Sequence, residues 1–183
     1  IGLVNISNLY EKWCLLQIIK VLTETFSFHM LEENWQNKVI DAVSKHSYNV
    51  KFSLMSEKLG RSIILTYEKE LPVTPDGKVY RPDYSMEVFD WSGNLLKTYI
   101  LDAKFKDTLN DASMKNIVDS LCVIGKKDYS ENKRNKVFII HASDSAIYNR
   151  SSPLQWGASS DYGQKSKHNR GGIYLSPSNN HGR

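Results

Sequence analysis

Three charged residues lie in a segment that otherwise has the pattern of buried β-structure. Asp102 and Lys104 interrupt a short run whose other members are almost all apolar: Tyr99, Ile100, Leu101, Ala103 and Phe105. Charged groups in such a strand are costly unless they are paired with an opposite charge or bind a ligand. The third residue, Asp83, follows a proline in the preceding strand-like stretch. The segment 79–106 is therefore the first candidate for a functional site.

A hairpin that turns symmetrically about Ser92 and Gly93 would bring these three residues together. In that register Asp83 lies directly opposite Asp102. Asp102 and Lys104 share one face of the strand, because side chains alternate with a period of two. The opposite face then collects large, mostly apolar side chains: Tyr84, Met86, Tyr99 and Leu101. The register predicts one tight cluster of two carboxylates and an ammonium group.

The chemistry of this cluster points to a divalent metal ion. Two carboxylates that face each other across a sheet repel, and a divalent cation removes that repulsion. Oxygen ligands without imidazole or thiolate favour Mg²⁺ or Mn²⁺ over zinc. Lys104 could orient or deprotonate a water molecule, or stabilise charge on a phosphate. The set suits metal-assisted phosphodiester hydrolysis, and the alternative is an ion-paired cluster in a half-exposed sheet.

The periodicity of the rest of the sequence predicts the elements that position this hairpin. Helices are expected over 8–25, 31–46 and 112–124, and the first should begin at Asn8 as N-cap and be largely buried. Strands are expected over 50–57, 62–70, 79–90, 95–105, 137–142 and 171–177. Residues 126–136 and 143–171 are expected to be loops.

The order of these elements indicates a fold class. Two helices precede a β-meander, and a helix and two late strands follow it. This order predicts an α/β fold with a mixed sheet, made of a central meander plus a crossover strand and flanked by helices. A length of 183 residues with 40% hydrophobic residues fits a single domain over 1–183.

Charge and composition narrow the partners and the compartment. Lys plus Arg is 24 and Asp plus Glu is 20, so the net charge of +4 permits an acidic partner such as nucleic acid. No apolar run approaches a membrane span, so no membrane partner is expected. Two cysteines, Cys14 and Cys122, indicate a reducing compartment, and we expect the cytoplasm. The start at Ile1, without methionine, suggests a fragment of a longer protein.

The same residues resemble a known nuclease signature. Pro82-Asp83 followed by Asp102-Ala103-Lys104 is similar to the PD-(D/E)-x-K motif, with Asp in the second acidic position. The sequence also resembles the McrC-like branch, the nuclease subunits of restriction systems, in three segments: 9–13 (LYEKW), 81–83 (RPD) and 101–106 (LDAKFK). The order of elements also matches over nearly the whole chain.

This resemblance implies a restriction-endonuclease-like fold and a Mg²⁺-dependent DNA endonuclease, in which Mn²⁺ can substitute. Asp83, Asp102 and Lys104 would be the catalytic residues, and cleavage would leave 5′-phosphate and 3′-hydroxyl ends. The resemblance also implies that Glu11, on the first helix, joins Asp83 and Asp102 as a metal ligand; its alternative role is a helix N-terminal carboxylate stabilised by the dipole. Relatives in this branch act with an AAA+ NTPase motor in restriction and anti-phage defence.

The densest basic segment is the candidate for contact with DNA. Its residues are Lys126, Lys127, Lys133, Arg134 and Lys136. The alternative is an ordinary solvated loop. The rival to the nuclease hypothesis is a catalytically inactive nuclease-like module that binds DNA or a partner protein.

Overall fold

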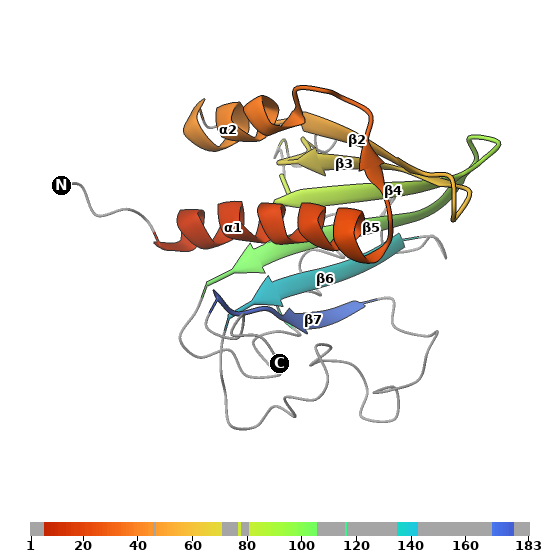
Figure 1. Ribbon diagram of the computed structural model, residues 1–183. Helices are drawn as coiled ribbons and strands as arrows, with labels where there is room; N and C mark the ends of the chain where they lie inside the picture. Colours follow the sequence, from red (N-terminus) through yellow and green to blue (C-terminus); the bar gives the residue numbers. More distant parts are fainter. Residues whose placement is uncertain are drawn as a thin grey trace. The chain divides into compact units, whose positions relative to one another are not determined.

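The computed structural model (Figure 1) describes residues 6–45, 47–70, 77, 81–105, 116, 135–142 and 170–177. The helical elements are α1 (Ile6–Lys20), the π-helical turn η1 (Val21–Thr25) and α2 (Trp35–Lys45). The strands are β1 (His29–Met30), β2 (Val50–Ser56), β3 (Arg61–Tyr67), β4 (Tyr84–Asp90), β5 (Leu95–Lys104), β6 (Asn135–His141) and β7 (Arg170–Tyr174). No helix among these residues is both long and apolar enough to cross a membrane.

The strands form a seven-stranded mixed sheet in the order β1-β2-β3-β4-β5-β6-β7. Strands β1 to β4 pair antiparallel, as a meander requires, whereas β6 and β7 pair parallel. Neighbouring parallel strands run in the same direction, so the chain must return from the end of one to the start of the next through a crossover connection. The α/β class with a mixed sheet that contains a meander and is flanked by helices is confirmed; the assignment of 137–142 as a crossover strand stays a prediction.

The chain divides into two compact units, Leu15–Ile100 and Ile1–Cys14 with Leu101–Arg183. Helix α1 and strand β5 each contain residues of both units. The single domain expected over 1–183 stays a prediction.

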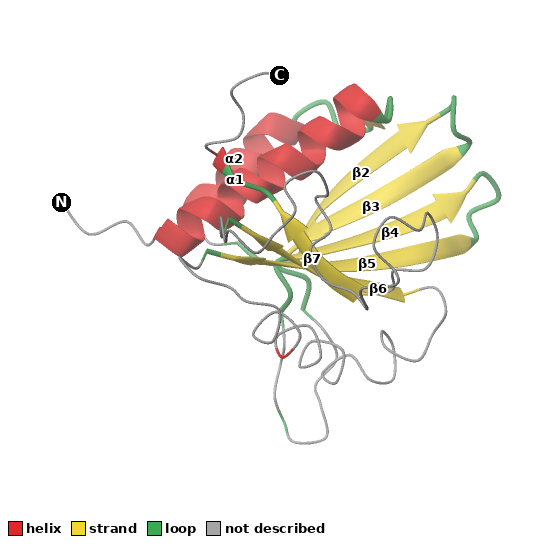
Figure 2. Ribbon diagram, turned by 90° about the horizontal axis from the view of Figure 1, so that it is seen from below, coloured by secondary structure: helices red, strands yellow, loops and turns green. Residues whose placement is uncertain are grey.

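The unit Leu15–Ile100 is built on the antiparallel meander. Figure 2 shows β2, β3 and β4 side by side, and Figure 1 shows α2 next to β2. Alternate strand residues point to one face, as the period of two requires, and the fully buried ones form a core under the helix. This core comprises Phe52, Leu54, Ile63, Leu65, Tyr67 and Tyr84, with Val39 and Ala42 from α2.

The expected hairpin over 50–70 is confirmed. Its register runs from Val50 opposite Tyr67 to Ser56 opposite Arg61. The turn ends at Gly60, whose φ of +60° suits a residue without a Cβ. Strand β3 ends at Tyr67, short of the expected limit at residue 70, because the backbone takes a left-handed conformation at Glu68, with φ of +46°.

The second unit is described by its parallel pair and the start of α1. Residues Val137 to Ile140 are all buried, as the apolar run predicts for a strand covered on both faces. The Tyr10 ring of α1 lies 5.4 Å from the Phe105 ring, and its hydroxyl donates to the Leu175 carbonyl oxygen at 2.6 Å. Tyr10 therefore anchors the helix to the residues that follow β5 and β7.

The first helix differs from its expected form at both ends. It begins at Ile6, so Asn8 lies inside it and is not the N-cap. The α-helix ends at Lys20, and Val21–Thr25 continue as a π-helical turn closed by Phe26 N–H donating to the Val21 oxygen at 3.2 Å. The helix is also less buried than predicted, since Leu9 and Leu16 are 58% and 46% exposed.

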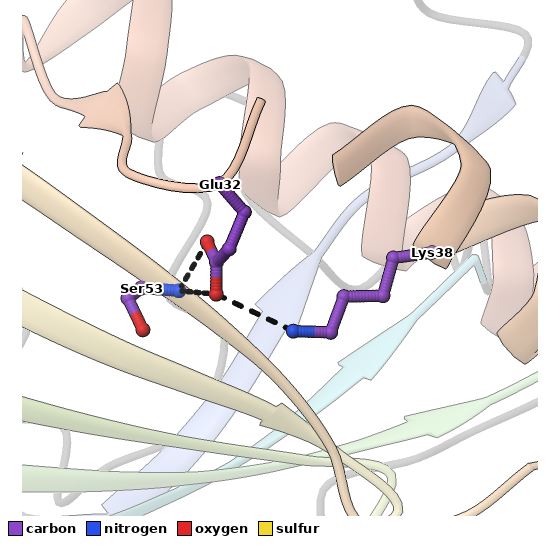
Figure 3. A network of polar contacts seen from close by, with 3 residues as sticks. All are labelled: Glu32, Lys38 and Ser53. Carbon is purple, nitrogen blue, oxygen red and sulfur yellow. Dashed lines mark hydrogen bonds and ion pairs between the residues drawn. The ribbon is translucent and has the colours of Figure 1, made fainter. Parts of the chain in front are cut away.

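The second helix is shorter than expected because its predicted first turn is used differently. Met30 pairs with Leu54 in the unpredicted strand β1, and the Leu31 N–H donates to the Ser53 oxygen at 2.9 Å. The Glu32 carboxylate then accepts the Ser53 N–H at 3.1 and 3.2 Å and the Lys38 ammonium at 3.3 Å (Figure 3). A side chain thus takes the place of a neighbouring strand at the sheet edge.

Several predicted elements lie outside the described residues. They are the helix 112–124, apart from the helical residue Asn116, and most of the loop 143–171. The end of that loop is corrected, because Arg170 and Gly171 already belong to β7. Of residues 71–80 only Gly77 is described, and its φ is +78°.

Candidate active site

Asp102 and Lys104 meet on one face of β5, as the strand period predicts. The Lys104 Nζ forms an ion pair with the Asp102 Oδ2. Asp102 is only 5% exposed, whereas the Lys104 side chain is 34% exposed. The lysine thus neutralises a buried carboxylate while keeping contact with water. The ion pair offsets part of the desolvation free energy that a charge in an apolar strand costs.

Asp83 lies just before β4, at the end of the meander opposite the β2–β3 turn. Its carbonyl oxygen accepts the Glu68 N–H at 2.7 Å, and the Glu68 carbonyl oxygen accepts the Asn49 N–H at 3.1 Å. The chain on its N-terminal side is anchored by the buried Pro82. A row of main-chain hydrogen bonds beyond the end of the regular pairing therefore fixes the backbone of Asp83.

Asn49 and Glu68 both have left-handed backbones, with φ of +57° and +46°. Asparagine adopts this conformation readily, so Asn49 is a signal that the sequence carried. Glutamate does so at a cost, so the conformation of Glu68 is imposed by its surroundings. The hydrogen-bond row to Asp83 was not predicted, because it depends on this unfavourable backbone.

The turn between β4 and β5 corrects the predicted register. Gly93 N–H donates to the Asp90 oxygen at 3.1 Å, and Asp90 N–H donates to the Asn94 oxygen at 3.0 Å. The turn thus has three residues, with Gly93 at φ +80°, and Asp90 faces Asn94 instead of Leu95. The Asp90 carboxylate stabilises it by accepting the N–H groups of Ser92 and Asn94 at 2.9 and 2.8 Å.

A shift of one residue exchanges the faces that meet across a hairpin. The symmetric register was therefore wrong at the turn, and it no longer supports the placement of Asp83 opposite Asp102. Asp83 belongs to the unit Leu15–Ile100 and Asp102 to the other unit. That these two carboxylates share one site stays a prediction.

Glu11 lies in α1, one residue after the Tyr10 anchor and one turn before the fully buried Leu15. Its side chain is half-buried. It belongs to the same unit as Asp102 and Lys104. Its role as a metal ligand stays a prediction.

The donor atoms fit a hard divalent cation. Asp102, Asp83 and Glu11 offer carboxylate oxygens, which Mg²⁺ and Mn²⁺ prefer. Within the described part of the chain, no group of three or more His, Cys, Asp or Glu side chains is assembled to hold a metal. The carboxylate oxygens of these three residues therefore suit a divalent metal by their chemistry, whereas their grouping around one metal ion stays a prediction.

The structure also places Glu87 and one residue of the basic segment. The Glu87 carboxylate forms an ion pair with Lys69 Nζ at 2.9 Å. Lys126, Lys127, Lys133 and Arg134 lie outside the described residues. Lys136 was predicted to lie in an exposed loop, and this is wrong, because Lys136 is half-buried in β6. The strand starts earlier than its apolar run and takes in two polar residues.

Comparisons with known proteins agree with the motif. A family model described as the PD-(D/E)XK nuclease superfamily matches residues 8–153, a range that contains Glu11, Asp83, Asp102 and Lys104. A curated relative, the "Pyrethroid hydrolase" of Klebsiella sp, is 36% identical over 172 residues, which cover 91% of this chain and 26% of that relative. The chain thus spans about a quarter of the length of this relative. No solved structure matches.

Proposed function

Because this chain belongs to the PD-(D/E)XK nuclease superfamily, we propose that it is a metal-dependent endonuclease that hydrolyses DNA phosphodiester bonds. The observation that carries the proposal is the ion pair between the buried Asp102 and Lys104. It stands at the second and third positions of the motif, inside the range that the family model matches. A structural ion pair has no need of a preceding Pro-Asp or of an acidic residue on the first helix.

In this proposal Asp83, Asp102 and Glu11 hold Mg²⁺, and Mn²⁺ can replace it. The metal, when bound, polarises the scissile phosphate and makes a water molecule more acidic. Lys104 orients the attacking water and balances the negative charge that develops on the phosphate. Water oxygen bonds to phosphorus, the bond to the 3′-oxygen breaks, and the products carry 5′-phosphate and 3′-hydroxyl ends.

The ion pair gives Lys104 a second role. Asp102 would hold a divalent cation through the carboxylate that pairs with Lys104 here, and Lys104, whose side chain is about a third exposed, would then turn toward solvent and substrate. The pair thus keeps the buried carboxylate neutralised when no metal is bound.

The biological setting proposed here rests on the McrC-like segments of the sequence. In that setting the chain acts in the cytoplasm, in restriction or anti-phage defence, with an AAA+ NTPase motor as partner. The rival is a nuclease-like module that binds DNA or a partner protein without cutting it.

The name of the Klebsiella relative raises pyrethroid hydrolysis as a second activity to test. The sequence has no G-x-S-x-G motif of the kind that carries a serine nucleophile. Activity in a relative four times as long can also reside outside the matched quarter. We therefore place this activity behind DNA cleavage.

The decisive experiment is plasmid nicking with Mg²⁺, with Mn²⁺ and with EDTA, run beside a pyrethroid hydrolysis assay. We expect metal-dependent nicking that Lys104→Ala reduces by at least about a hundredfold while metal binding, measured by calorimetry, persists. Asp41→Asn, at an exposed ion pair of α2, is the matched control. Near-normal nicking by Lys104→Ala would remove the role assigned to it, and metal-independent pyrethroid turnover without nicking would overturn the proposal.

A further inference from the structure

Arg81, two residues before Asp83, lies over the ring of the exposed Tyr48. The Arg81 Cζ lies 4.8 Å from the centre of the Tyr48 ring. Tyr48 is 54% exposed and Arg81 is exposed as well, so burial of apolar surface does not explain the contact. This cation–π contact orients the guanidinium, and its exposed N–H groups remain available to a ligand.

Main-chain hydrogen bonds connect this pair to Asp83. Tyr48 precedes Asn49, whose N–H donates to the Glu68 oxygen, and the Glu68 N–H donates to the Asp83 oxygen. The Asn49 side chain adds a bond, since its Oδ1 accepts the Glu70 N–H at 2.8 Å. Tyr48 and Arg81 are thus held at a fixed spacing from the backbone of Asp83.

The charges at this end of the meander single out Arg81. The nearby Lys69 is neutralised by Glu87 at 2.9 Å. Arg81, in contrast, forms no ion pair with any carboxylate in the described part of the chain. An exposed guanidinium that is oriented by an aromatic ring and has no acidic partner among the described residues matches the fork geometry of a phosphate.

We propose that Arg81, held by Tyr48, is a phosphate contact that positions the nucleic-acid backbone beside Asp83. The inference rests on the proposed nuclease function and adds a binding residue to it. Because a phosphate contact carries no base information, the contribution of Arg81 is the same on every sequence.

The test is duplex DNA affinity, measured by fluorescence anisotropy across several salt concentrations with Ca²⁺ in place of Mg²⁺. Arg81→Ala weakens binding on the order of tenfold and lowers the slope of log affinity against log salt by about 0.9. Arg81→Lys keeps the slope but loses part of the affinity, because an ammonium cannot make the paired contact. Tyr48→Phe behaves as the parent, and Tyr48→Ala loses affinity with an unchanged slope.

Arg61→Ala is the matched control. Arg61 is also exposed, but it lies at the opposite end of β3, where it faces Ser56 and Asp90. The inference is overturned if Arg81→Ala and Arg61→Ala give the same slope. Circular dichroism of each variant confirms folding, and Arg81→Lys, the gentlest change, provides the comparison if Arg81→Ala unfolds.

Two further outcomes separate this inference from the proposed function. Duplex binding with an Arg81-dependent slope but no cleavage under any divalent ion supports the phosphate contact and overturns the nuclease. Metal-dependent cleavage with a slope that ignores Arg81 supports the nuclease and overturns the contact. Absence of any DNA binding by the parent chain overturns both.

Discussion

The two ends of the β2–β3–β4 meander are built in different ways. At the turn end, positive φ angles fall on glycines, Gly60 at +60° and Gly93 at +80°. At the end that carries Asp83, they fall on Asn49 at +57° and Glu68 at +46° as well as on Gly77 of the β3–β4 connection at +78°. Glycine takes this conformation without steric cost, whereas a side chain with a Cβ does not.

The difference indicates which end is shaped for something besides folding. The turn end is satisfied locally, since the Asp90 carboxylate accepts hydrogen bonds from its own turn. The other end has an unfavourable backbone at Glu68, whose N–H donates to the Asp83 carbonyl oxygen and so holds the backbone of Asp83. Backbone strain of this kind concentrates at functional sites, where the surrounding structure maintains it. Five substitutions at four positions test this contrast, from the largest expected effect to the smallest.

The largest effect is expected from exchanging one aspartate at each end for asparagine. Asp83→Asn should reduce metal-dependent nicking by at least about a hundredfold, because it removes a proposed metal ligand. Asp90→Asn should leave nicking within about twofold, because its carboxylate serves only the turn. Equal losses in the two variants would mean that the ends do not differ in function.

Glu68 tests whether the strain is present and what it serves. Glu68→Gly should stabilise the fold by up to about 1 kcal/mol, since glycine relieves the left-handed backbone but gains entropy when unfolded. Glu68→Thr should destabilise it by about 1 kcal/mol or more, because β-branching opposes positive φ. Urea unfolding measures both. A threonine variant as stable as the parent would show that the left-handed conformation is not imposed.

Gly93→Ala provides the counterpart at the turn end. No atom lies within 4 Å of the Cβ that this substitution adds, so only the φ of +80° resists it. We expect a loss of about 1 kcal/mol in the free energy of unfolding, with nicking unchanged. A larger loss, or a loss of nicking, would tie this turn to the site.

The smallest effect concerns the pH dependence of the turn end. The hydrogen bond from the Asn94 side chain, with its backbone N–H, lowers the pKa of Asp90 below its ordinary value of 3.8. A carboxyl group whose pKa is lower when folded stabilises the protein above its unfolded pKa, and this stabilisation is lost as the pH falls through the folded pKa. Asp90→Asn should therefore flatten the decline of the urea midpoint below about pH 4, and an identical decline in both proteins would contradict the assignment.

Local patterns were sufficient for several of the strands and for one contact of the proposed site. Alternation over 50–70 predicted the β2–β3 hairpin, and the same period of two placed Asp102 and Lys104 on one face, where they form an ion pair. The apolar run at 137–142 likewise predicted β6. In each case the relevant property repeats over neighbouring residues of a single strand, so no distant partner is needed to specify it.

Only the tertiary structure decided features that depend on a partner far along the chain. The β4–β5 register shifted because Asp90 and Asn94 select a three-residue turn, and a one-residue change in a turn is invisible to periodicity. The first turn of the predicted second helix was lost because Glu32 bonds Ser53, twenty-one residues away. The placement of Arg81 over Tyr48 and the anchoring of Asp83 by Glu68 arise in the same way. Hydrogen bonds and ring contacts between strand ends depend on where the sheet brings those ends, which no single segment of sequence specifies.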